Sequence, residues 1–449
     1  MGRLFGTDGA RGIANTEITG ELAMRIGRAT AMVLAENTKS RPKVLIGMDT
    51  RKSGDMLACA LASGLCSVGA DVLMLGVVPT PAVAYLVKTY NYDAGVMISA
   101  SHNPCEYNGI KIFQSSGYKL PDEMENEIEA IILDEVRQPP VMIGGDVGEV
   151  TRAVNAKRDY INHLASAAVS QFYGIRAAVD CANGSASVTA SQLFKQIGAE
   201  AIILNADPDG VNINLNCGST HIEGLSEFVK AHDYEVGFAF DGDADRLLCV
   251  DEDGTVVDGD QIMAIASKYY KTKNKLNGNT LVGTVMSNLG LRKFCENEGI
   301  NFEATKVGDR YVLERMLEKG YSIGGEQSGH IIFLDHATTG DGELSAVMVL
   351  NIMRETGKSL KELAKEIDIY PQILKNVKVS AFGKHRLNED EDIKIAIKKA
   401  EEELGDEGRV LVRASGTEPL IRVMLEGKDL EKIDRLSDMI ADVVKDKLL

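Results

Sequence analysis

Short apolar runs alternate with helix-like segments along the first part of the chain. Residues 43–48 (KVLIGM), 71–76 (DVLMLG) and 94–99 (AGVMIS) consist mainly of apolar residues. Runs of this length and composition are typical of strands that are buried on both faces of a parallel sheet. Because helical patterns separate them, we expect a parallel sheet with helices on both sides.

The same rhythm restarts twice further along the chain. Residues 175–180, 200–205 and 236–240 alternate with helical patterns, and 280–285 is followed by helices and by a short run at 322–325. Each repeat spans roughly one hundred residues, which is a normal domain size. The pattern predicts three similar α/β modules with mixed or parallel sheets.

The C-terminal segment has a different order of elements. Apolar residues recur at helical spacing through 388–404, before Gly405, and again from Leu430 onward. Strand-like runs at 410–412 and 421–425 lie between these two helices. This order predicts a small α+β domain. The domain boundaries that we place are 1–153, 154–256, 257–370 and 371–449.

Length and composition are those of a soluble protein with several domains. The chain has 449 residues, of which 44% are hydrophobic, so it can form several cores. Its apolar runs are shorter than the eighteen or so residues of a membrane span, and its start lacks the apolar region of a signal peptide. We therefore expect a cytoplasmic protein with no membrane partner.

The net charge and the cysteine content disfavour certain partners and certain kinds of site. The net charge of −17 argues against nucleic acid as a partner. It also repels phosphorylated ligands at long range, so an anion site must be built locally from Arg, Lys and backbone N–H groups. The seven cysteines are odd in number and contain no C-x-x-C pair. This speaks against a disulfide framework and against a zinc site.

The segment DGDADR directly follows the predicted strand 236–240. Asp241, Asp243 and Asp245 alternate along it, so their carboxylates can converge on one hard cation such as Mg²⁺. A calcium-binding EF-hand loop is disfavoured because Arg246 stands at the sixth position, where that loop needs glycine. A plain acidic turn is the other interpretation.

A serine-containing loop, ISASHNPCEYNGIK at residues 98–111, follows the predicted strand 94–99. A serine at a strand end can act as a nucleophile if another group activates it. His102 and Lys111 are close in sequence and offer such groups. A polar turn explains the same composition, and nothing local chooses between Ser99 and Ser101.

The loop GGEQSGH at residues 324–330 follows another short strand-like run. Glu326 and Ser328 are two positions apart, so both can point into one site. A carboxylate and a hydroxyl suit the hydroxyl groups of a sugar. A tight turn that only needs its glycines is the alternative.

The loop RASGTEP at residues 413–419 has the composition of an anion site. Ser415, Gly416 and Thr417 offer hydroxyls and open backbone N–H groups, and Arg413 and Arg422 offer charged forks. In a chain this acidic, the loop is a candidate phosphate site, with a simple turn as the alternative.

Together and in this order, the four loops resemble those of the α-D-phosphohexomutase superfamily. The resemblance covers the whole chain and implies three α/β modules plus a C-terminal α+β domain around a central cleft, with one loop from each domain. It implies that Ser101 is the phosphorylated serine and that Asp241, Asp243 and Asp245 bind the metal. The other implied site residues are the sugar contacts Glu326 and Ser328, the phosphate contacts Arg413, Ser415, Gly416, Thr417 and Arg422, and the cationic or proton-transferring residues Arg11, Lys111, Arg246, Lys306 and His330.

Further segments make the chain most similar to a bacterial branch that acts on glucosamine phosphates. These segments are residues 5–12 (FGTDGARG), 207–221 and 307–312 (VGDRYV), together with Gln327 in the sugar loop. Tyr107 departs from this branch, which usually has Asp there. The implied reaction interconverts glucosamine 6-phosphate and glucosamine 1-phosphate, a step toward UDP-N-acetylglucosamine and the bacterial wall.

The resemblance also implies a phosphoserine mechanism. Ser101 carries a phosphoryl group whose oxygen completes a Mg²⁺ site, and transfer to the sugar gives a sugar bisphosphate before Ser101 takes back the other phosphate. A sugar bisphosphate or autophosphorylation would prime Ser101, and Lys111 or His330 would accept the hydroxyl proton. The expected partner is a sugar phosphate, with a homodimer as the candidate assembly. We expect the last domain, joined near residue 370, to rotate when substrate binds.

Other functions fit part of the same pattern. A phosphoglucomutase or phosphomannomutase would share the fold and differ in the sugar. A metal-dependent sugar phosphatase would hydrolyse the phosphoserine instead of returning the group. A catalytically inactive sugar-phosphate sensor is disfavoured because Ser101 and all three aspartates are present.

Overall fold

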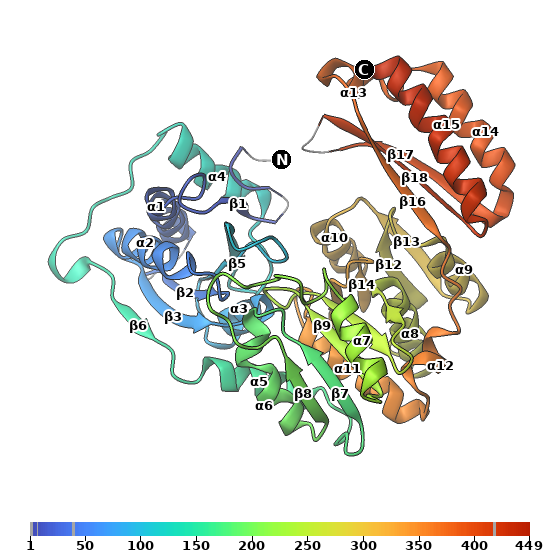
Figure 1. The fold of residues 1–449 in the computed structure, drawn as a ribbon. Coiled ribbons are helices and arrows are strands. Elements are labelled where there is room, and N and C mark those ends of the chain that lie inside the picture. The colour runs from blue at the N-terminus through green and yellow to red at the C-terminus, as the bar shows by residue number, and fades with distance from the viewer. Residues whose placement is uncertain (1–2, 7, 38–40, 416–418) are drawn as a thin grey trace. The chain divides into compact units, whose positions relative to one another are not determined.

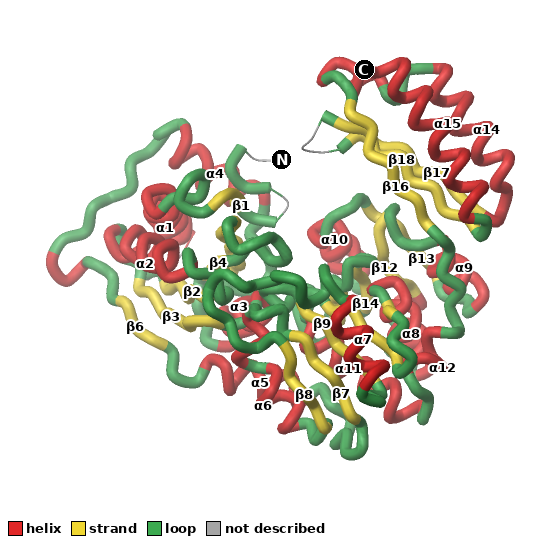
Figure 2. Tube along the Cα trace, viewed as in Figure 1, coloured by secondary structure: helices red, strands yellow, loops and turns green. Residues whose placement is uncertain are grey.

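The computed structural model describes residues 3–6, 8–37, 41–415 and 419–449. Its chain divides into two compact units, one of Met1–Met286 with Ile300–Lys365 and one of Ser287–Gly299 with Glu366–Leu449. Figures 1 and 2 show the helices and strands of both. Among the described residues, no helix is both long enough and apolar enough to cross a bilayer.

The first sheet of the first unit has six strands. In spatial order they are β1 (Ala10–Ile13), β5 (Tyr107–Gln114), β4 (Ala94–Ile98), β2 (Lys43–Met48), β3 (Asp71–Val77) and β6 (Val150–Arg152). The apolar strands β2, β3 and β4 pair in parallel, whereas β5 runs antiparallel to β4. This antiparallel pairing places the loop between Ile98 and Tyr107 at the end of the central strands.

Helices cover this sheet because their apolar stripes match its buried strands. They are α1 (Gly20–Asn37), α2 (Gly54–Ser67), α3 (Thr80–Thr89) and α4 (Asp122–Leu133). Helix α1 packs on α2 and α4, while α3 packs on β2 and β4. Residues of α1, α2 and α4 form one core with strand residues such as Val44, Ile46 and Val96.

The second sheet carries the aspartate loop. Its five strands, in spatial order, are β11 (Val256–Val257), β10 (Leu247–Asp251), β9 (Val236–Phe240), β7 (Arg176–Asp180) and β8 (Glu200–Leu204), with helices α5 (Ala156–Ser166), α6 (Ala190–Gln196) and α7 (Glu223–Ala231). Strands β9 and β10 form a hairpin in which Phe240 pairs with Leu247. Residues 241–246 are therefore the turn of a hairpin whose strands are buried.

The third sheet presents the sugar loop in the same way. Its strands are β13 (Asn301–Thr305), β12 (Thr280–Thr284), β14 (Ile323–Gly325) and β15 (Ile331–Phe333), and its helices are α8 (Gly259–Thr272), α10 (Asp309–Lys319), α11 (Gly342–Thr356) and α12 (Leu360–Ala364). β14 and β15 pair antiparallel, so residues 326–330 form their connecting turn. Short 3₁₀ turns of this unit lie at Gly144–Asp146, Ser185–Val188 and Asn277–Asn279.

The second unit is a three-stranded antiparallel sheet covered by helices. Its strands are β16 (Gln372–Lys378), β18 (Leu420–Gly427) and β17 (Gly408–Ala414), and its helices are α9 (Leu289–Asn297), α13 (Ala381–Arg386), α14 (Glu391–Leu404) and α15 (Leu430–Leu448), with a 3₁₀ turn at Gly405–Glu407. The apolar faces of α14 and α15 pack on this sheet to form its core.

Helix α9 belongs to this unit although it lies far away in the sequence. The Asn288 amide donates to the carbonyl of Tyr370 at 2.9 Å and its Oδ1 accepts from the Tyr370 N–H at 3.0 Å. The backbone N–H of Leu289 donates to Glu426 at 3.2 Å, and the Lys293 ammonium donates to the carbonyl of Asp406 at 2.6 Å. Hydrogen bonds at the N-terminus and in the middle of α9 therefore join it to the C-terminal segment.

Candidate active site

The serine loop between β4 and β5 holds Ser101 in an unusual backbone conformation. Ser101 has a φ of +52° and is 1% exposed. A non-glycine residue in this region costs on the order of 1–3 kcal/mol, so surrounding contacts must maintain it. The guanidinium of Arg51 and the amide of Asn214 both donate to the Ser101 carbonyl at 2.9 Å. Residues from two modules therefore fix the loop.

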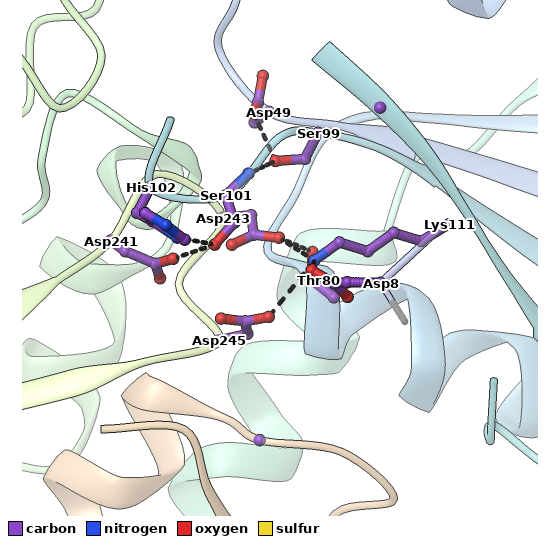
Figure 3. A network of polar contacts seen from close by, with 12 residues as sticks. Asp8, Asp49, Thr80, Ser99, Ser101, His102, Lys111, Asp241, Asp243 and Asp245 are labelled. Carbon is purple, nitrogen blue, oxygen red and sulfur yellow. Dashed lines mark hydrogen bonds and ion pairs between the residues drawn. The ribbon is translucent and has the colours of Figure 1, made fainter. Parts of the chain in front are cut away.

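The two serines of this loop have different partners (Figure 3). Ser99 Oγ donates to Asp49 Oδ2 at 2.6 Å and accepts the Ser101 N–H at 2.9 Å, so it supports the loop itself. Ser101 Oγ instead donates to Asp241 Oδ2 at 2.6 Å. Only the second hydroxyl therefore faces the aspartate cluster, which favours Ser101 as the reactive one.

His102 lies beside the Ser101 hydroxyl, with its Nδ1 3.3 Å from Oγ. Burial lowers the pKa of His102, and the nearby charges of Arg246 and Arg11 lower it further, to about 4. The ring is therefore neutral at neutral pH. The sequence places His102 next to Ser101, but no motif assigns it to the site.

The three aspartates of the β9–β10 turn converge in a buried cluster. One carboxylate oxygen from each of Asp241, Asp243 and Asp245 lies within 4.8 Å of the others. Burial raises the pKa of Asp241, and the charges of Asp245 and Asp243 raise it further. Three buried carboxylates this close are unfavourable unless positive charge offsets them.

Two oxygens in this cluster have no hydrogen-bond partner in the described part of the chain. They are Asp243 Oδ1 and Asp245 Oδ1, and both are buried. An unpartnered buried carboxylate oxygen is costly, and a divalent cation with oxygen ligands is the group that satisfies it. The donor set, all carboxylate oxygens, fits Mg²⁺.

Lys111 from β5 neutralises part of this charge. Its Nζ lies 2.9 Å from Asp243 Oδ2, 3.5 Å from Asp245 Oδ2 and 3.4 Å from Asp8 Oδ2. Burial alone lowers the pKa of Lys111, but the three carboxylates outweigh it and raise the pKa above its ordinary value. Thr80 Oγ1 also donates to Asp243 Oδ2, at 2.6 Å. Lys111 is therefore charged, and Asp243 Oδ2 has two hydrogen-bond donors, the Lys111 ammonium and the Thr80 hydroxyl.

Two arginines predicted for the site lie at its edge. The backbone N–H of Arg246 donates to Asp241 Oδ1 at 3.3 Å, and its Nε lies 3.8 Å from Asp245 Oδ1. The guanidinium of Arg11 pairs with the carboxylate of Asp8. Both cations are close enough to lower the pKa of His102, so they lie near the serine loop.

His330 follows the sugar loop and joins it to the aspartate turn. Its Nδ1 lies 3.6 Å from Asp245 Oδ2, and its Nε2 accepts the Gly340 N–H at 3.1 Å. A side chain at position 340 would meet the imidazole at 2.6 Å, so glycine is required there. Burial lowers the pKa of His330, but Asp245 and Asp309 outweigh it and raise the pKa to about 8.

The remaining predicted sugar contacts are more exposed. Ser328 is exposed, as is Lys306, whose ammonium lies 5.8 Å from the centre of the Tyr311 ring. Glu326 Oε1 accepts the Gly308 N–H at 3.0 Å, which ties the sugar loop to the segment before α10. Gln327 donates to Asp258 Oδ2 at 3.0 Å, so it supports the N-cap of α8.

Strands β17 and β18 of the second unit flank the predicted phosphate loop. Arg413 and Arg422 are directly opposite each other on these strands. Burial lowers the pKa of Arg413, and the charge of Arg422 lowers it further. Like charges facing each other across strands are unfavourable, and a bound anion would offset this. Ser415 is buried beside them, whereas Gly416 and Thr417 lie outside the described residues.

Models of four domains of one protein family match successive parts of the chain. Models described as "Phosphoglucomutase/phosphomannomutase, alpha/beta/alpha domain I", II and III match residues 2–139, 158–254 and 258–370. The model of the C-terminal domain of the same family matches residues 374–443.

Similar proteins have the same length. The chain is 54% identical to the phosphoglucosamine mutases of Ruminiclostridium cellulolyticum and Acetivibrio thermocellus over 448 residues, with 100% of both chains covered in each case. It is 55% identical to the phosphoglucosamine mutase of Thermoanaerobacter sp., again with 100% of both covered.

Solved structures share the fold. A phosphoglucomutase/phosphomannomutase family protein from Burkholderia thailandensis matches with a TM-score of 0.84 and 24% identity, over 99% of this chain and 98% of that one. Aspergillus fumigatus N-acetylphosphoglucosamine mutase, in complex with GlcNAc-6P and magnesium, matches with a TM-score of 0.74 and 18% identity, over 99% and 96%. The four domain matches and the full-length relatives together show that this chain belongs to the phosphoglucomutase/phosphomannomutase family.

Proposed function

We propose that the protein interconverts glucosamine 6-phosphate and glucosamine 1-phosphate, the reaction of the phosphoglucosamine mutases. The observation that carries the chemistry is the buried Ser101 hydroxyl, 2.6 Å from Asp241, in a cluster with two unpartnered carboxylate oxygens. This arrangement suits phosphoryl transfer through a serine beside a divalent cation. The amino sugar rests on the full-length identity to relatives of that name.

In this proposal Ser101 carries the phosphoryl group and gives it to the sugar. Asp241, Asp243 and Asp245, with a phosphoryl oxygen on Ser101, would hold Mg²⁺, which neutralises charge on the transferred group when bound. Arg246 and Arg11 add positive charge beside the loop. Because His102 is neutral and within 3.3 Å of Ser101 Oγ, it can orient that hydroxyl without repelling a cation.

Proton transfer falls to Lys111 or His330 in this scheme. Carboxylates surround the Lys111 ammonium, so in the substrate-free protein it holds its proton and is suited to donate one. The Asp245 carboxylate beside Nδ1 of His330 favours the charged ring. The Gly340 N–H, which donates to Nε2, favours the neutral ring. The pKa of His330, about 8, lies nearer to neutral pH than that of Lys111, so a larger fraction of His330 is neutral and able to accept the proton of the sugar hydroxyl.

Sugar and phosphate recognition complete the proposal. Glu326 and Ser328 would bind sugar hydroxyls, and Lys306 would add a charge. Arg413, Ser415, Gly416, Thr417 and Arg422 would bind the phosphate that is not being transferred, because the facing pair of arginines favours an anion. A sugar bisphosphate or autophosphorylation would prime Ser101. We also propose a cytoplasmic location. We further propose a homodimer, and light scattering would test this assembly.

The test is a coupled assay with glucosamine, glucose and mannose phosphates on the purified protein. We expect the largest kcat/KM for glucosamine 1-phosphate, and a larger value for glucose 1-phosphate would contradict the amino-sugar assignment. Steady release of inorganic phosphate without isomerisation would instead indicate a phosphatase. Intact-mass measurement should show one phosphoryl group on the wild-type protein and none on Ser101→Ala.

A further inference from the structure

Six ionisable side chains form a closed ring of contacts beside the aspartate turn. Acidic and basic groups alternate around it. In order they are Asp245, Lys111, Asp8, Lys119, Asp309 and His330. The sequence motifs assign no role in the reaction to three of these residues, Asp8, Lys119 and Asp309.

One half of the ring passes through Lys111. Its Nζ lies 3.5 Å from Asp245 Oδ2 and 3.4 Å from Asp8 Oδ2, as Figure 3 shows. The other oxygen of Asp8, Oδ1, accepts a hydrogen bond from Lys119 Nζ at 2.7 Å. Asp8 is therefore shared between Lys111, Lys119 and the guanidinium of Arg11, and of the two lysines only Lys111 reaches the aspartate turn.

The other half passes through His330. Lys119 Nζ donates to Asp309 Oδ2 at 2.7 Å, and the same oxygen lies 3.6 Å from His330 Nε2. His330 Nδ1 lies 3.6 Å from Asp245 Oδ2, which closes the ring. With Lys111 and His330 both at its Oδ2, Asp245 keeps its Oδ1 free of protein hydrogen bonds in the described residues.

Three modules contribute to the ring, and Lys119 joins the first to the third. Lys119 follows β5, and Asp309 is the first residue of α10. Their side chains are 15% and 16% exposed, so water screens the pair only partly. The next residue, Arg310, lies 3.5 Å from Glu125 of α4 and also pairs with Asp122. The N-terminus of α10 is thus tied to the first module at two consecutive positions.

Removal of Lys119 would change the surroundings of both proton-transferring residues, Lys111 and His330. Asp8 Oδ1 would lose its partner, and Asp8 would be left with Lys111 and Arg11 at Oδ2, so it would fix the position of Lys111 beside Asp243 and Asp245 less firmly. Asp309 would lose its 2.7 Å ammonium partner and would compete with Asp245 for the His330 ring. Within the described residues, Lys119 itself forms hydrogen bonds with Asp8 and Asp309 and none with Ser101 or the three aspartates.

We propose that Lys119 and Asp309 are positioning residues, which hold Lys111 and His330 on either side of Asp245 for phosphoryl transfer. The inference rests on the proposed function. It assigns a role to the acidic residue of the VGDRYV segment and to a lysine that lies outside all four loops. Outer partners of this kind commonly contribute about 10- to 100-fold to activity or metal affinity.

The experiment compares Lys119→Met, Lys119→Arg and Asp309→Asn in the glucosamine phosphate assay, with Mg²⁺ binding measured by calorimetry. We expect kcat to fall about 10- to 100-fold in Lys119→Met and Asp309→Asn while KM changes little, because the proposal gives neither residue a contact with the sugar. Lys119→Arg restores the charge and should recover most of kcat. The double variant should lose less than the product of the two single losses, because the pair acts as a unit.

Lys273→Met is the matched control. It removes an ion pair of similar length, 2.6 Å to Glu355, that involves no member of the ring, so kcat should stay at the wild-type value. Unchanged kcat in folded Lys119→Met, or losses that only track a lower Tm with no recovery in Lys119→Arg, would overturn the positioning role. A wild-type protein inactive on all three sugar phosphates would refute the proposed function instead.

Discussion

Replacement of Ser101 tests both the nucleophile and the strained loop. Ser101→Ala removes the hydroxyl that donates to Asp241 at 2.6 Å but keeps a side chain at φ +52°. Ser101→Gly removes the same hydroxyl and also relieves the backbone. Ser99→Ala keeps the Ser101 hydroxyl and removes only its support, the contact with Asp49 and with the Ser101 N–H. The three variants therefore separate chemistry from loop geometry.

The contacts give expected magnitudes. Loss of a hydrogen bond to a charged group costs about 1.5–3 kcal/mol, so both Ser101 variants should be less stable than wild type. Glycine adopts the left-handed backbone without strain, which stabilises the folded glycine variant by roughly 1–2 kcal/mol relative to the alanine variant. The greater entropy of its unfolded chain offsets about 0.5–1 kcal/mol of this gain. Ser101→Gly should therefore melt roughly 1–3 °C above Ser101→Ala in metal-free buffer.

Activity should follow a different order. Both Ser101 variants should lose mutase activity by several orders of magnitude, on the scale of about 10⁶ seen when a covalent nucleophile is removed. Ser99→Ala should lose only about 10- to 100-fold, as an outer support. The measurements are the coupled assay, thermal melts and intact mass. An inactive Ser99→Ala with an active Ser101→Ala would reverse the choice of nucleophile, and equal melting temperatures for the two Ser101 variants would refute the strain argument.

The remaining predictions concern the metal, the phosphate loop and a buried carboxyl. Mg²⁺ should raise the Tm, and chelation should abolish turnover. Asp243→Asn should show a smaller rise in Tm with Mg²⁺ and a lower turnover, because one of three ligand charges is lost. Full activity after chelation would contradict the metal site. Arg413→Ala should raise KM roughly 30-fold, equivalent to a charged hydrogen bond of about 2 kcal/mol, and should release more free bisphosphate, and an unchanged KM would remove it from the phosphate site. Burial raises the pKa of Asp341 to about 7, so its contribution to stability is present below the ordinary aspartate pKa and is lost as pH rises to about 7. Asp341→Asn should therefore gain Tm over wild type progressively between about pH 4 and 7, and a pH-independent difference would contradict the shifted pKa.

Much of the fold could be predicted because buried parallel strands have continuous apolar runs. Residues 43–48 and 236–240 are strands with the predicted bounds, and the four-domain α/β architecture is confirmed. Strands with mixed composition were not identified. β5 starts with Tyr-Asn-Gly although most of it is buried, and β13 (NFEAT) and β16 (QILKNVK) mix apolar and polar residues because both are partly exposed.

The candidate site was predictable where its residues cluster in one loop. The alternating aspartates fall in one hairpin turn, so local spacing was sufficient to group them. The Lys119 ring has no local pattern, because Asp8, Lys119 and Asp309 come from separate segments and meet only through tertiary packing. Choice of Ser101 over Ser99 likewise required the direction of each hydroxyl, which spacing does not contain.

The position of α9 affects the order in which the protein can fold during synthesis. The helix emerges from the ribosome before Tyr370 and Glu426, to which Asn288 and Leu289 bond. Its N-terminal hydrogen bonds are therefore incomplete until β18, which contains Glu426, has been translated. Native pairing between segments so distant in sequence slows folding. The nascent chain thus holds α9 without its C-terminal hydrogen-bond partners for most of the synthesis of its last domain.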